Sequence, residues 1–231
     1  MKKNNVLILN GSPKINNSSS KSLAEFMENE LNKKGVDPKI RRVSTCIASE
    51  QGVVELMECI READLLFLIS PLYVDSLPYN VIKMLELIKI YIGPDTGNRS
   101  KKFFALSHSG LDVTKNDVSV RIYERFAKEL NFNFGGSLAL GTSSIINGNS
   151  LNFMNRMTKN LRKSLEIISE SIFTGNSIPP KVQKLLSKPF LPAPLFLNKI
   201  LLNATMKSCY REKDFTKGLA KLHSKLKIFL S

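Results

Sequence analysis

Strand-like segments of six to eight residues, most of them apolar, alternate with helical segments throughout the first 173 residues of the chain. Strands are expected at residues 5–10, 38–43, 63–70, 102–107 and 133–140. The first and third of these are almost continuously apolar, which is typical of strands buried on both faces of a parallel sheet. A regular alternation of strand and helix favours right-handed crossovers, with helices on both faces of the sheet. The sequence therefore predicts an α/β fold around a five-stranded parallel sheet.

Helical spacing of apolar residues is found between these strands. Helices are expected at residues 20–34, around 53–60, at 78–92 and 116–130, and after Asn149 as far as residue 172. The first of them follows three serines, at residues 18 to 20, that can cap its first turn, and Gly35 stands just past its end. These signals predict that the polar loop before residue 20 leads directly into a helix N-terminus.

Residues 174–231 differ in kind from the rest, because prolines interrupt them and no strand pattern returns. They hold eleven Lys and Arg against two acidic residues, which is +9 of the formal net charge of +14. A helix is expected at residues 214–230, with an apolar stripe on one face: Phe215, Leu219, Leu222, Leu226 and Phe229. We therefore expect two domains, residues 1–173 and a basic helical extension at 174–231. The extension would pack on the first domain or on a second subunit.

The basic face of this extension leaves several interpretations open. It is either a solvated lysine-rich surface or a surface that attracts nucleic acid, an anionic membrane or dinucleotide phosphates. The segment from Phe190 to Leu197 would be an apolar anchor in the membrane interpretation, and a dimer contact or a lid in the others.

The cysteines and the apolar runs indicate the compartment. No segment approaches the roughly 20 consecutive apolar residues of a membrane span, and the run at residues 6–9 is too short for a signal peptide. Cys46, Cys59 and Cys209 are odd in number and lack CxxC spacing, which favours buried thiols over a disulfide framework or a metal site. We expect a cytoplasmic chain with no transmembrane segment and no bound metal.

The loop after the first strand, residues 10–21, is rich in hydroxyl groups and short polar side chains. A helix N-terminus presents free N–H groups, so such a loop suits a terminal phosphate. The loop has neither the GxxxxGK[ST] pattern of nucleoside triphosphatases nor the GxGxxG pattern that binds a dinucleotide pyrophosphate. The alternative is a polar loop with an ordinary helix cap.

A second polar loop follows the third strand and again leads into a helix. Its residues 70–78 read Ser-Pro-Leu-Tyr-Val-Asp-Ser-Leu-Pro, and the first loop contains Gly-Ser-Pro-Lys at residues 11–14. The two loops together resemble those of the NADPH-dependent FMN reductase, quinone reductase and azoreductase group of the flavodoxin-like superfamily. The resemblance covers about residues 4 to 173 and implies a flavodoxin-like three-layer sandwich that binds FMN.

The resemblance also implies roles for individual residues. The FMN phosphate would be held by Ser12, Ser18, Ser19 and Ser20, with Lys14 or Asn17 alongside. The isoalloxazine ring would be lined by Pro71, Leu72, Tyr73, Val74 and Asp75, mainly through backbone groups. Tyr73 is alternatively a plain core aromatic residue. The first loop has Asn16 where the group commonly has glycine before Asn-Ser or Asn-Thr, and Val74 stands where relatives often carry a polar or aromatic residue. These two departures put the flavin affinity and the tuning of the flavin's reduction potential in question.

A third loop, after the fourth strand, falls where this group contacts the pyrimidine edge of the flavin. Its expected cofactor-binding residues are Ser107, Ser109 and Gly110. His108 has a side chain whose ordinary pKa is near neutrality, so it is a candidate proton donor to the reduced flavin or to a substrate. The alternative for His108 is simple positioning.

The resemblance implies an enzyme that passes hydride from NADPH or NADH through bound FMN to a quinone, nitro, azo or free-flavin acceptor. It also implies a homodimer, because the flavin site in this group is commonly completed by a second subunit. The alternative is a non-enzymatic electron carrier of the flavodoxin type, but such carriers are usually acidic and this chain carries +14. A third interpretation is a flavin-free binding module whose basic extension docks on a membrane or nucleic acid; for the enzyme no nucleic acid is expected.

Overall fold

The computed structural model describes residues 5–73, 76–95, 98, 100–110, 117–154 and 157–187. The chain divides into two compact units, Met1–Phe190 and Leu191–Ser231, and all the described residues belong to the first. The expected helix at 214–230, the segment from Phe190 to Leu197 and Cys209 lie outside the described residues.

Five parallel strands form one sheet. They are β1 (Val6–Asn10), β2 (Lys39–Arg42), β3 (Leu65–Pro71), β4 (Lys102–His108) and β5 (Asn133–Leu140). Their order in the sheet is β2-β1-β3-β4-β5, which is the flavodoxin-like order. The predicted α/β fold with five parallel strands is confirmed, and each strand starts and ends within two residues of its expected position.

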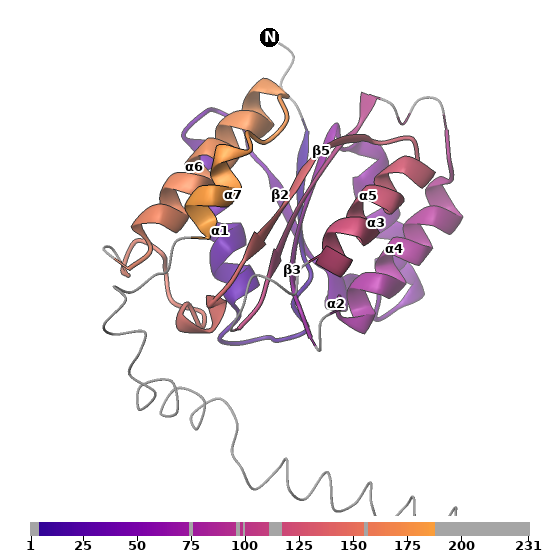
Figure 1. Cartoon of the computed structure of the whole chain (residues 1–231). Coiled ribbons are helices and arrows are strands. Elements are labelled where there is room, and N and C mark those ends of the chain that lie inside the picture. The colour runs from indigo at the N-terminus through magenta and orange to yellow at the C-terminus, as the bar shows by residue number, and fades with distance from the viewer. Residues whose placement is uncertain are drawn as a thin grey trace, which may run out of the picture. The chain divides into compact units, whose positions relative to one another are not determined.

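Helices cover both faces of the sheet (Figure 1). One face carries α1 (Ser19–Asn32), α6 (Lys159–Thr174) and α7 (Lys181–Leu186). The other carries α2 (Val43–Cys46), α3 (Glu50–Glu62), α4 (Tyr79–Ile92) and α5 (Asp117–Glu129). The three layers of a flavodoxin-like sandwich follow from this arrangement.

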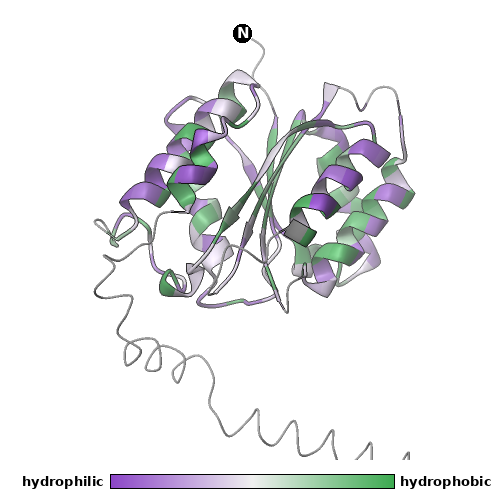
Figure 2. Cartoon of the chain, viewed as in Figure 1, coloured by the Kyte–Doolittle hydropathy of each residue, from purple (hydrophilic) through white to green (hydrophobic). Residues whose placement is uncertain are grey.

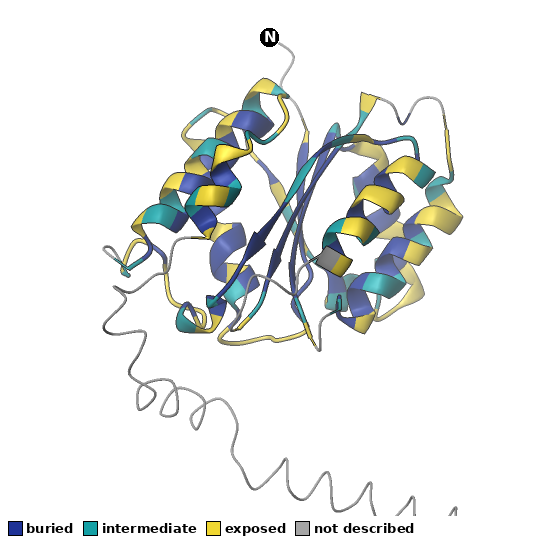
Figure 3. Cartoon of the chain, viewed as in Figure 1, coloured by how far each residue is buried: buried dark blue, intermediate teal, exposed yellow. Residues whose placement is uncertain are grey.

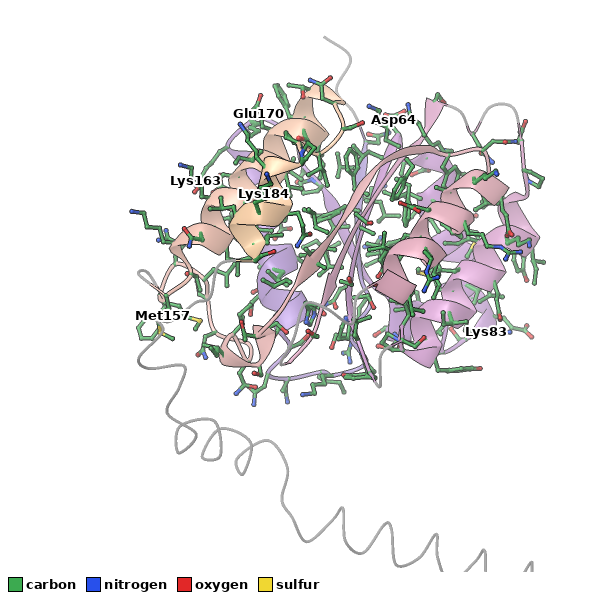
Figure 4. The ribbon with its side chains drawn as sticks, in the orientation of Figure 1. Asp64, Lys83, Met157, Lys163, Glu170 and Lys184 are labelled. Carbon is green, nitrogen blue, oxygen red and sulfur yellow. The ribbon has the colours of Figure 1, made fainter. Side chains whose placement is uncertain are left out.

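Each face of the sheet has its own hydrophobic core, because side chains alternate along a strand. Val6 and Ile8 of β1 pack into the core under α1 and α6, and Leu7 and Leu9 pack into the core under α3 and α4. The apolar residues accordingly gather on the strands and on the inner faces of the helices (Figures 2 and 3). The outer faces of α6 and α7 carry exposed charged side chains such as Lys163, Glu170 and Lys184 (Figure 4).

Two expected elements differ from the structure. The helix predicted after Asn149 begins only at Lys159, and the residues described between them form turns that include a hydrogen bond from the Thr158 hydroxyl to the Leu151 carbonyl (2.7 Å). The second strand ends at Arg42, and Val43 starts the one-turn helix α2, which no periodicity predicted because four residues are too few to show one.

Helix α7 lies beyond the expected domain boundary between residues 173 and 174, yet it packs against α6 and β5. The Gln183 side chain occupies the place of a neighbouring strand: its Oε1 accepts from the Ala139 N–H (2.9 Å) and its Nε2 donates to the Ala139 carbonyl (3.0 Å). The Ile178 N–H donates to the Gly135 carbonyl (2.8 Å). These contacts cover the edge of β5, which would otherwise be open to pairing with another chain. The division into domains stays a prediction.

In the described part of the chain, none of the helices has the length and apolar character that crossing a membrane requires.

Candidate functional site

The carboxyl ends of β1, β3 and β4 meet at one edge of the sheet, at the lower end of the strands in Figure 1. The strand order reverses between β1 and β3, since the chain goes from β1 outward to β2 and then returns to the far side of β1. Ligands of open parallel sheets bind at such a reversal, outside the carboxyl ends of the strands. All three loops that the sequence singled out start here.

The loop after β1, residues 11–18, which we call loop one, is held from both sides. The Gly11 N–H donates to the Ile69 carbonyl of β3 (2.8 Å), and the Asn80 side chain at the start of α4 donates to the Gly11 carbonyl (3.0 Å). A Cβ on Gly11 would lie 2.7 Å from Cγ2 of Val81. The loop can therefore approach α4 this closely only with glycine at this position.

Side chains at the start of the loop accept hydrogen bonds from backbone N–H groups two residues further on. The Asn10 side-chain oxygen accepts from the Ser12 N–H (3.0 Å), and the Ser12 hydroxyl oxygen accepts from the Lys14 N–H (3.2 Å). Asn17 has a left-handed backbone with φ of 50°, a conformation that asparagine tolerates better than most residues. The loop thus reaches α1 through two local turns.

Ser18 is the N-cap of α1, and its hydroxyl oxygen accepts from the Lys21 N–H (3.3 Å). The N–H groups of Ser19 and Ser20 belong to the first turn and have no acceptor within the helix. These N–H groups, together with the positive end of the helix dipole, make the loop suitable for an anion.

His108, at the end of β4, is hydrogen-bonded to helix α1 and to the segment after β5, and both hydrogen bonds are buried. Its Nε2 lies 2.7 Å from the Ser20 hydroxyl of α1, and its Nδ1 lies 2.8 Å from the Ser143 hydroxyl after β5. The Ser143 hydroxyl donates to the Ser109 carbonyl (2.8 Å), so it accepts from Nδ1–H of His108. The imidazole is therefore the Nδ1–H tautomer, and the Ser20 hydroxyl donates to Nε2.

Burial lowers the pKa of His108 from 6.5 to about 3, and the positive charge of Lys14 adds to the effect. A histidine with this pKa is neutral at physiological pH and has no proton to give from an imidazolium. Both of its ring nitrogens also have protein partners. Of the two roles considered from the sequence, the geometry favours positioning over proton donation.

The serines of the first loop use their hydroxyl groups within the protein. Ser20 donates to His108, and the Ser19 hydroxyl donates to the Ser143 carbonyl (2.8 Å). Ser12 and Ser18 are almost fully buried and accept from backbone N–H groups. The structure thus brings all four serines together. Ser19 and Ser20 use their O–H donors within the fold, while Ser12 and Ser18 only accept, so the donors left for a ligand are the Ser12 and Ser18 hydroxyls, backbone N–H groups and the exposed Lys14.

The loop after β3 lies beside the loop after β4. The Leu72 N–H donates to the His108 carbonyl (2.8 Å), while Tyr73 and Ser76 exchange backbone hydrogen bonds around a tight turn. Pro71 is buried, Leu72 is half-buried and Tyr73 is 42% exposed, so Tyr73 is not a core residue. Val74 and Asp75 lie outside the described residues.

The three predicted cofactor-binding residues of the loop after β4 differ in how far they are buried. Ser107 is fully buried and donates to the Leu138 carbonyl (3.3 Å), so its hydroxyl points into the fold, and a ligand contact by this side chain is not supported. Ser109 is half-buried and Gly110 is exposed at the sheet edge.

Sequence reasoning missed four residues that build this site: Asn10, Asn80, Arg42 and Ser143. Asn10 is the last residue of β1 and Asn80 is the second of α4, positions from which a short amide side chain reaches loop backbone; that placement was a usable signal. Arg42 donates to the Pro13 carbonyl (2.9 Å), and Ser143 binds His108, but their distance in sequence gave no indication of either contact.

The strand order and the three loops define the chain as a flavodoxin-like protein. Residues 4–114, which are 111 of the 231, match the NADPH-dependent FMN reductase family. The chain therefore has a flavodoxin-like fold, and its residues 4–114 are similar to the NADPH-dependent FMN reductase family. That part contains β1 to β4 and all three loops.

Several solved structures share this fold. An NADH:FMN oxidoreductase (EMOB) in its apo form has a TM-score of 0.56 at 15% identity, covering 84% of this chain and 100% of its own. A putative quinone reductase from Klebsiella pneumoniae has a TM-score of 0.59 at 12% identity, covering 77% and 88%. An FMN-dependent NADH-azoreductase from Bacillus anthracis, in complex with FMN, has a TM-score of 0.56 at 13% identity, covering 73% and 99%. No curated protein matches the chain by sequence.

Proposed function

We propose that this protein is an FMN-dependent oxidoreductase that uses NADPH or NADH. The observation that carries the proposal is the start of α1 at the strand reversal of a flavodoxin-like sheet, where the N–H groups of Ser19 and Ser20 have no acceptor within the helix. This donor set fits a single terminal phosphate, as FMN has, and the family match covers the loop.

The residues around this edge would hold FMN in two places. Backbone N–H groups of loop one and of Ser19 and Ser20 would bind the phosphate, with the Lys14 ammonium adding charge. Pro71, Leu72 and Tyr73, continued by Val74 and Asp75, would form the apolar slot for the ring. Ser109 and Gly110 would approach its polar edge from the other side.

Bound FMN supplies a carrier that takes a hydride from nicotinamide and passes it to an acceptor. The protein's part is to bind and orient the two substrates in turn on the open side of the ring. His108 would hold the helix α1 and the loops after β4 and β5 in register around the phosphate and the ring. No covalent nucleophile is required.

We propose a quinone, nitro, azo or free-flavin acceptor, supported by the quinone reductase and azoreductase among the structural neighbours. The rival is a flavodoxin-type electron carrier, which the net charge of +14 disfavours. Steady-state oxidation of NADPH and NADH with each acceptor class tests this. Turnover with a small-molecule acceptor and parallel double-reciprocal plots are expected; a protein that carries FMN but does not turn over with any acceptor would be a carrier.

A homodimer in the cytoplasm is the second part of the proposal. Large apolar side chains are exposed at the carboxyl edge of the sheet, among them Ile15 (72%), Tyr79 (78%) and Phe153 (86%). A second copy would cover such a rim and close the site. The unbonded thiols of Cys46 and Cys59 fit a reducing compartment. Sedimentation at micromolar concentration should give a dimer, and a monomer would contradict the dimer proposal.

A further inference from the structure

Thr142, which lies just after the end of β5, has a left-handed backbone with φ of 54° and ψ of 24°. The other non-glycine residues with positive φ in the described part of the chain are all asparagines, which adopt this conformation more readily. For a β-branched residue such a backbone is strained, whereas glycine adopts it without a steric penalty. Strain of this kind persists where the surroundings hold it, and it concentrates at functional sites.

The residue after Thr142 accounts for the backbone conformation. The Ser143 N–H and the Ser143 hydroxyl both donate to the Ser109 carbonyl, at 2.9 Å and 2.8 Å. The Ser143 hydroxyl also accepts from His108, and the Ser143 carbonyl accepts from the Ser19 hydroxyl (2.8 Å). The left-handed turn at Thr142 brings Ser143 from the end of β5 to these partners, and their hydrogen bonds hold the turn in place.

The hydrogen bonds of Ser143 do not explain why residue 142 is a threonine, because glycine would make the same turn without strain. The Thr142 side chain does not cap the 3-10 helix η3 (Ser143–Ile145) that follows it, and its hydroxyl forms no hydrogen bond with the part of the chain that the structure describes. Thr142 is half-buried, and the next residue is bonded to Ser109 at the carboxyl edge of the sheet. An unbonded hydroxyl donor therefore lies next to the loop assigned above to the polar edge of the flavin ring.

The segment after β5 also reaches the phosphate end of the candidate site. Gly148 has a positive φ of 84°, and a Cβ at this position would lie 2.7 Å from the Cα of Asn17 in loop one. The backbones of the two loops are therefore in direct contact at Gly148. The segment from Thr142 to Gly148 thus borders the site from the loop after β4 to loop one, and a ligand that spans the site would lie along it.

We propose that Thr142 binds FMN, with its hydroxyl donating a hydrogen bond to the polar edge of the ring. The inference rests on the proposed function and adds to it a residue that none of the three loops contains. A donor at this edge stabilises negative charge that develops on the ring, so it raises the reduction potential of the flavin. The contact with FMN explains why threonine stands where glycine would relieve the strain.

Three substitutions separate the backbone strain from the hydroxyl group. Thr142→Gly removes both, Thr142→Val keeps the shape and the strain without the hydroxyl, and Thr142→Ser keeps the hydroxyl. Thermal unfolding of the flavin-free protein should give a Tm about 2–4 °C higher for Thr142→Gly than for the wild type, because the strain is relieved. Thr142→Val should show no such gain.

Fluorescence titration with FMN and redox titration of the complex measure the contribution of the hydroxyl. The Kd for FMN should rise about three- to tenfold in Thr142→Gly and Thr142→Val, and stay within about twofold of the wild type in Thr142→Ser. The midpoint potential of bound FMN should be lower in Thr142→Gly and Thr142→Val than in the wild type and Thr142→Ser. A loss of packing alone would not produce this dependence on the hydroxyl.

Asn131→Gly is the matched control, because Asn131 also has a left-handed backbone (φ of 58°) but precedes β5, at the opposite edge of the sheet. It should leave the Kd for FMN unchanged. If the wild type binds FMN and the Kd is the same in Thr142→Gly and Thr142→Val, or rises equally in Asn131→Gly, the inference is overturned and the proposed function stands. A lower Tm for Thr142→Gly would also overturn it, since the threonine would then serve the fold. If the wild type does not bind FMN, the proposed function fails and the inference fails with it.

Discussion

Between pH 7.5 and pH 4.5 the wild-type protein should lose roughly 2–3 kcal/mol more unfolding free energy than a His108→Gln variant. The pKa of His108 is lowered to about 3 in the folded protein by burial, while an unfolded histidine has its ordinary value near 6.5. As the pH falls below 6.5 the unfolded chain takes up a proton that the folded protein refuses, so acid favours unfolding. The contribution is present above pH 6.5 and is progressively lost between pH 6.5 and pH 3.

Glutamine is the appropriate replacement because it cannot ionise and can still bond to the Ser20 hydroxyl, while other titrating groups contribute equally to both proteins. Urea denaturation at several pH values measures the difference. Parallel stability curves for the wild type and His108→Gln would show that the imidazole is protonated freely in the folded state. His108 would then be restored as a candidate proton donor.

Gly11→Ala should lower the free energy of unfolding by about 1–3 kcal/mol and weaken FMN binding together with it. The added methyl would lie 2.7 Å from Cγ2 of Val81 and 3.1 Å from the Ile69 carbonyl oxygen, in a place where both neighbours are fully buried. Loop one must then move away from α4. That movement strains the hydrogen bond from the Asn80 side chain to the Gly11 carbonyl.

Gly110→Ala is the control for stability, because its Cβ would meet only the Cβ of Ser144, at 4.0 Å. It should change the free energy of unfolding by no more than about 0.5 kcal/mol. Thermal and urea unfolding, with FMN titration of each variant, give both quantities. A Gly11→Ala protein as stable as Gly110→Ala, with unchanged FMN affinity, would contradict the close packing of loop one on α4.

The sequence predicted those features of the fold that depend on local patterns. Continuous apolar runs such as 65–69 are typical of strands covered on both faces, and polar loops after them mark the ligand edge of a parallel sheet. The order and spacing of the loops then favoured one superfamily. All of this information lies within a few residues along the chain.

Features that depend on distant contacts were not predictable in this way. His108 was expected to titrate near neutrality, because nothing near it in the sequence shows that Ser20 and Ser143 would enclose it. All four serines of the first loop were expected to hold a phosphate, and the hydroxyls of Ser19 and Ser20 donate within the fold instead, so phosphate binding by the serines stays a prediction. The hydrogen-bond partners of the His108, Ser19 and Ser20 side chains are more than 30 residues away, so the roles of these side chains depend on tertiary packing. Ser12 and Ser18 accept from N–H groups only two and three residues away.

The late start of α6 and the presence of α7 also depend on tertiary packing. The apolar residues between 154 and 172 keep a helical rhythm, but a buried turn that ends in the Thr158 hydrogen bond delays the helix to Lys159. Helix α7 follows Pro179 and Pro180, which were interpreted as breaks, although proline is well tolerated at the start of a helix. Its stability comes from packing against β5, which composition does not reveal.

The central claim is that loop one and the start of α1 form a terminal-phosphate site for FMN. The most direct measurement is fluorescence titration of the flavin-free protein with FMN and with FAD, followed by the visible spectrum of the FMN complex before and after NADPH is added. The expected result is one FMN per chain, tighter binding of FMN than of FAD, and bleaching of the flavin absorption by NADPH. Tighter binding of FAD, or no binding of either flavin, would contradict it.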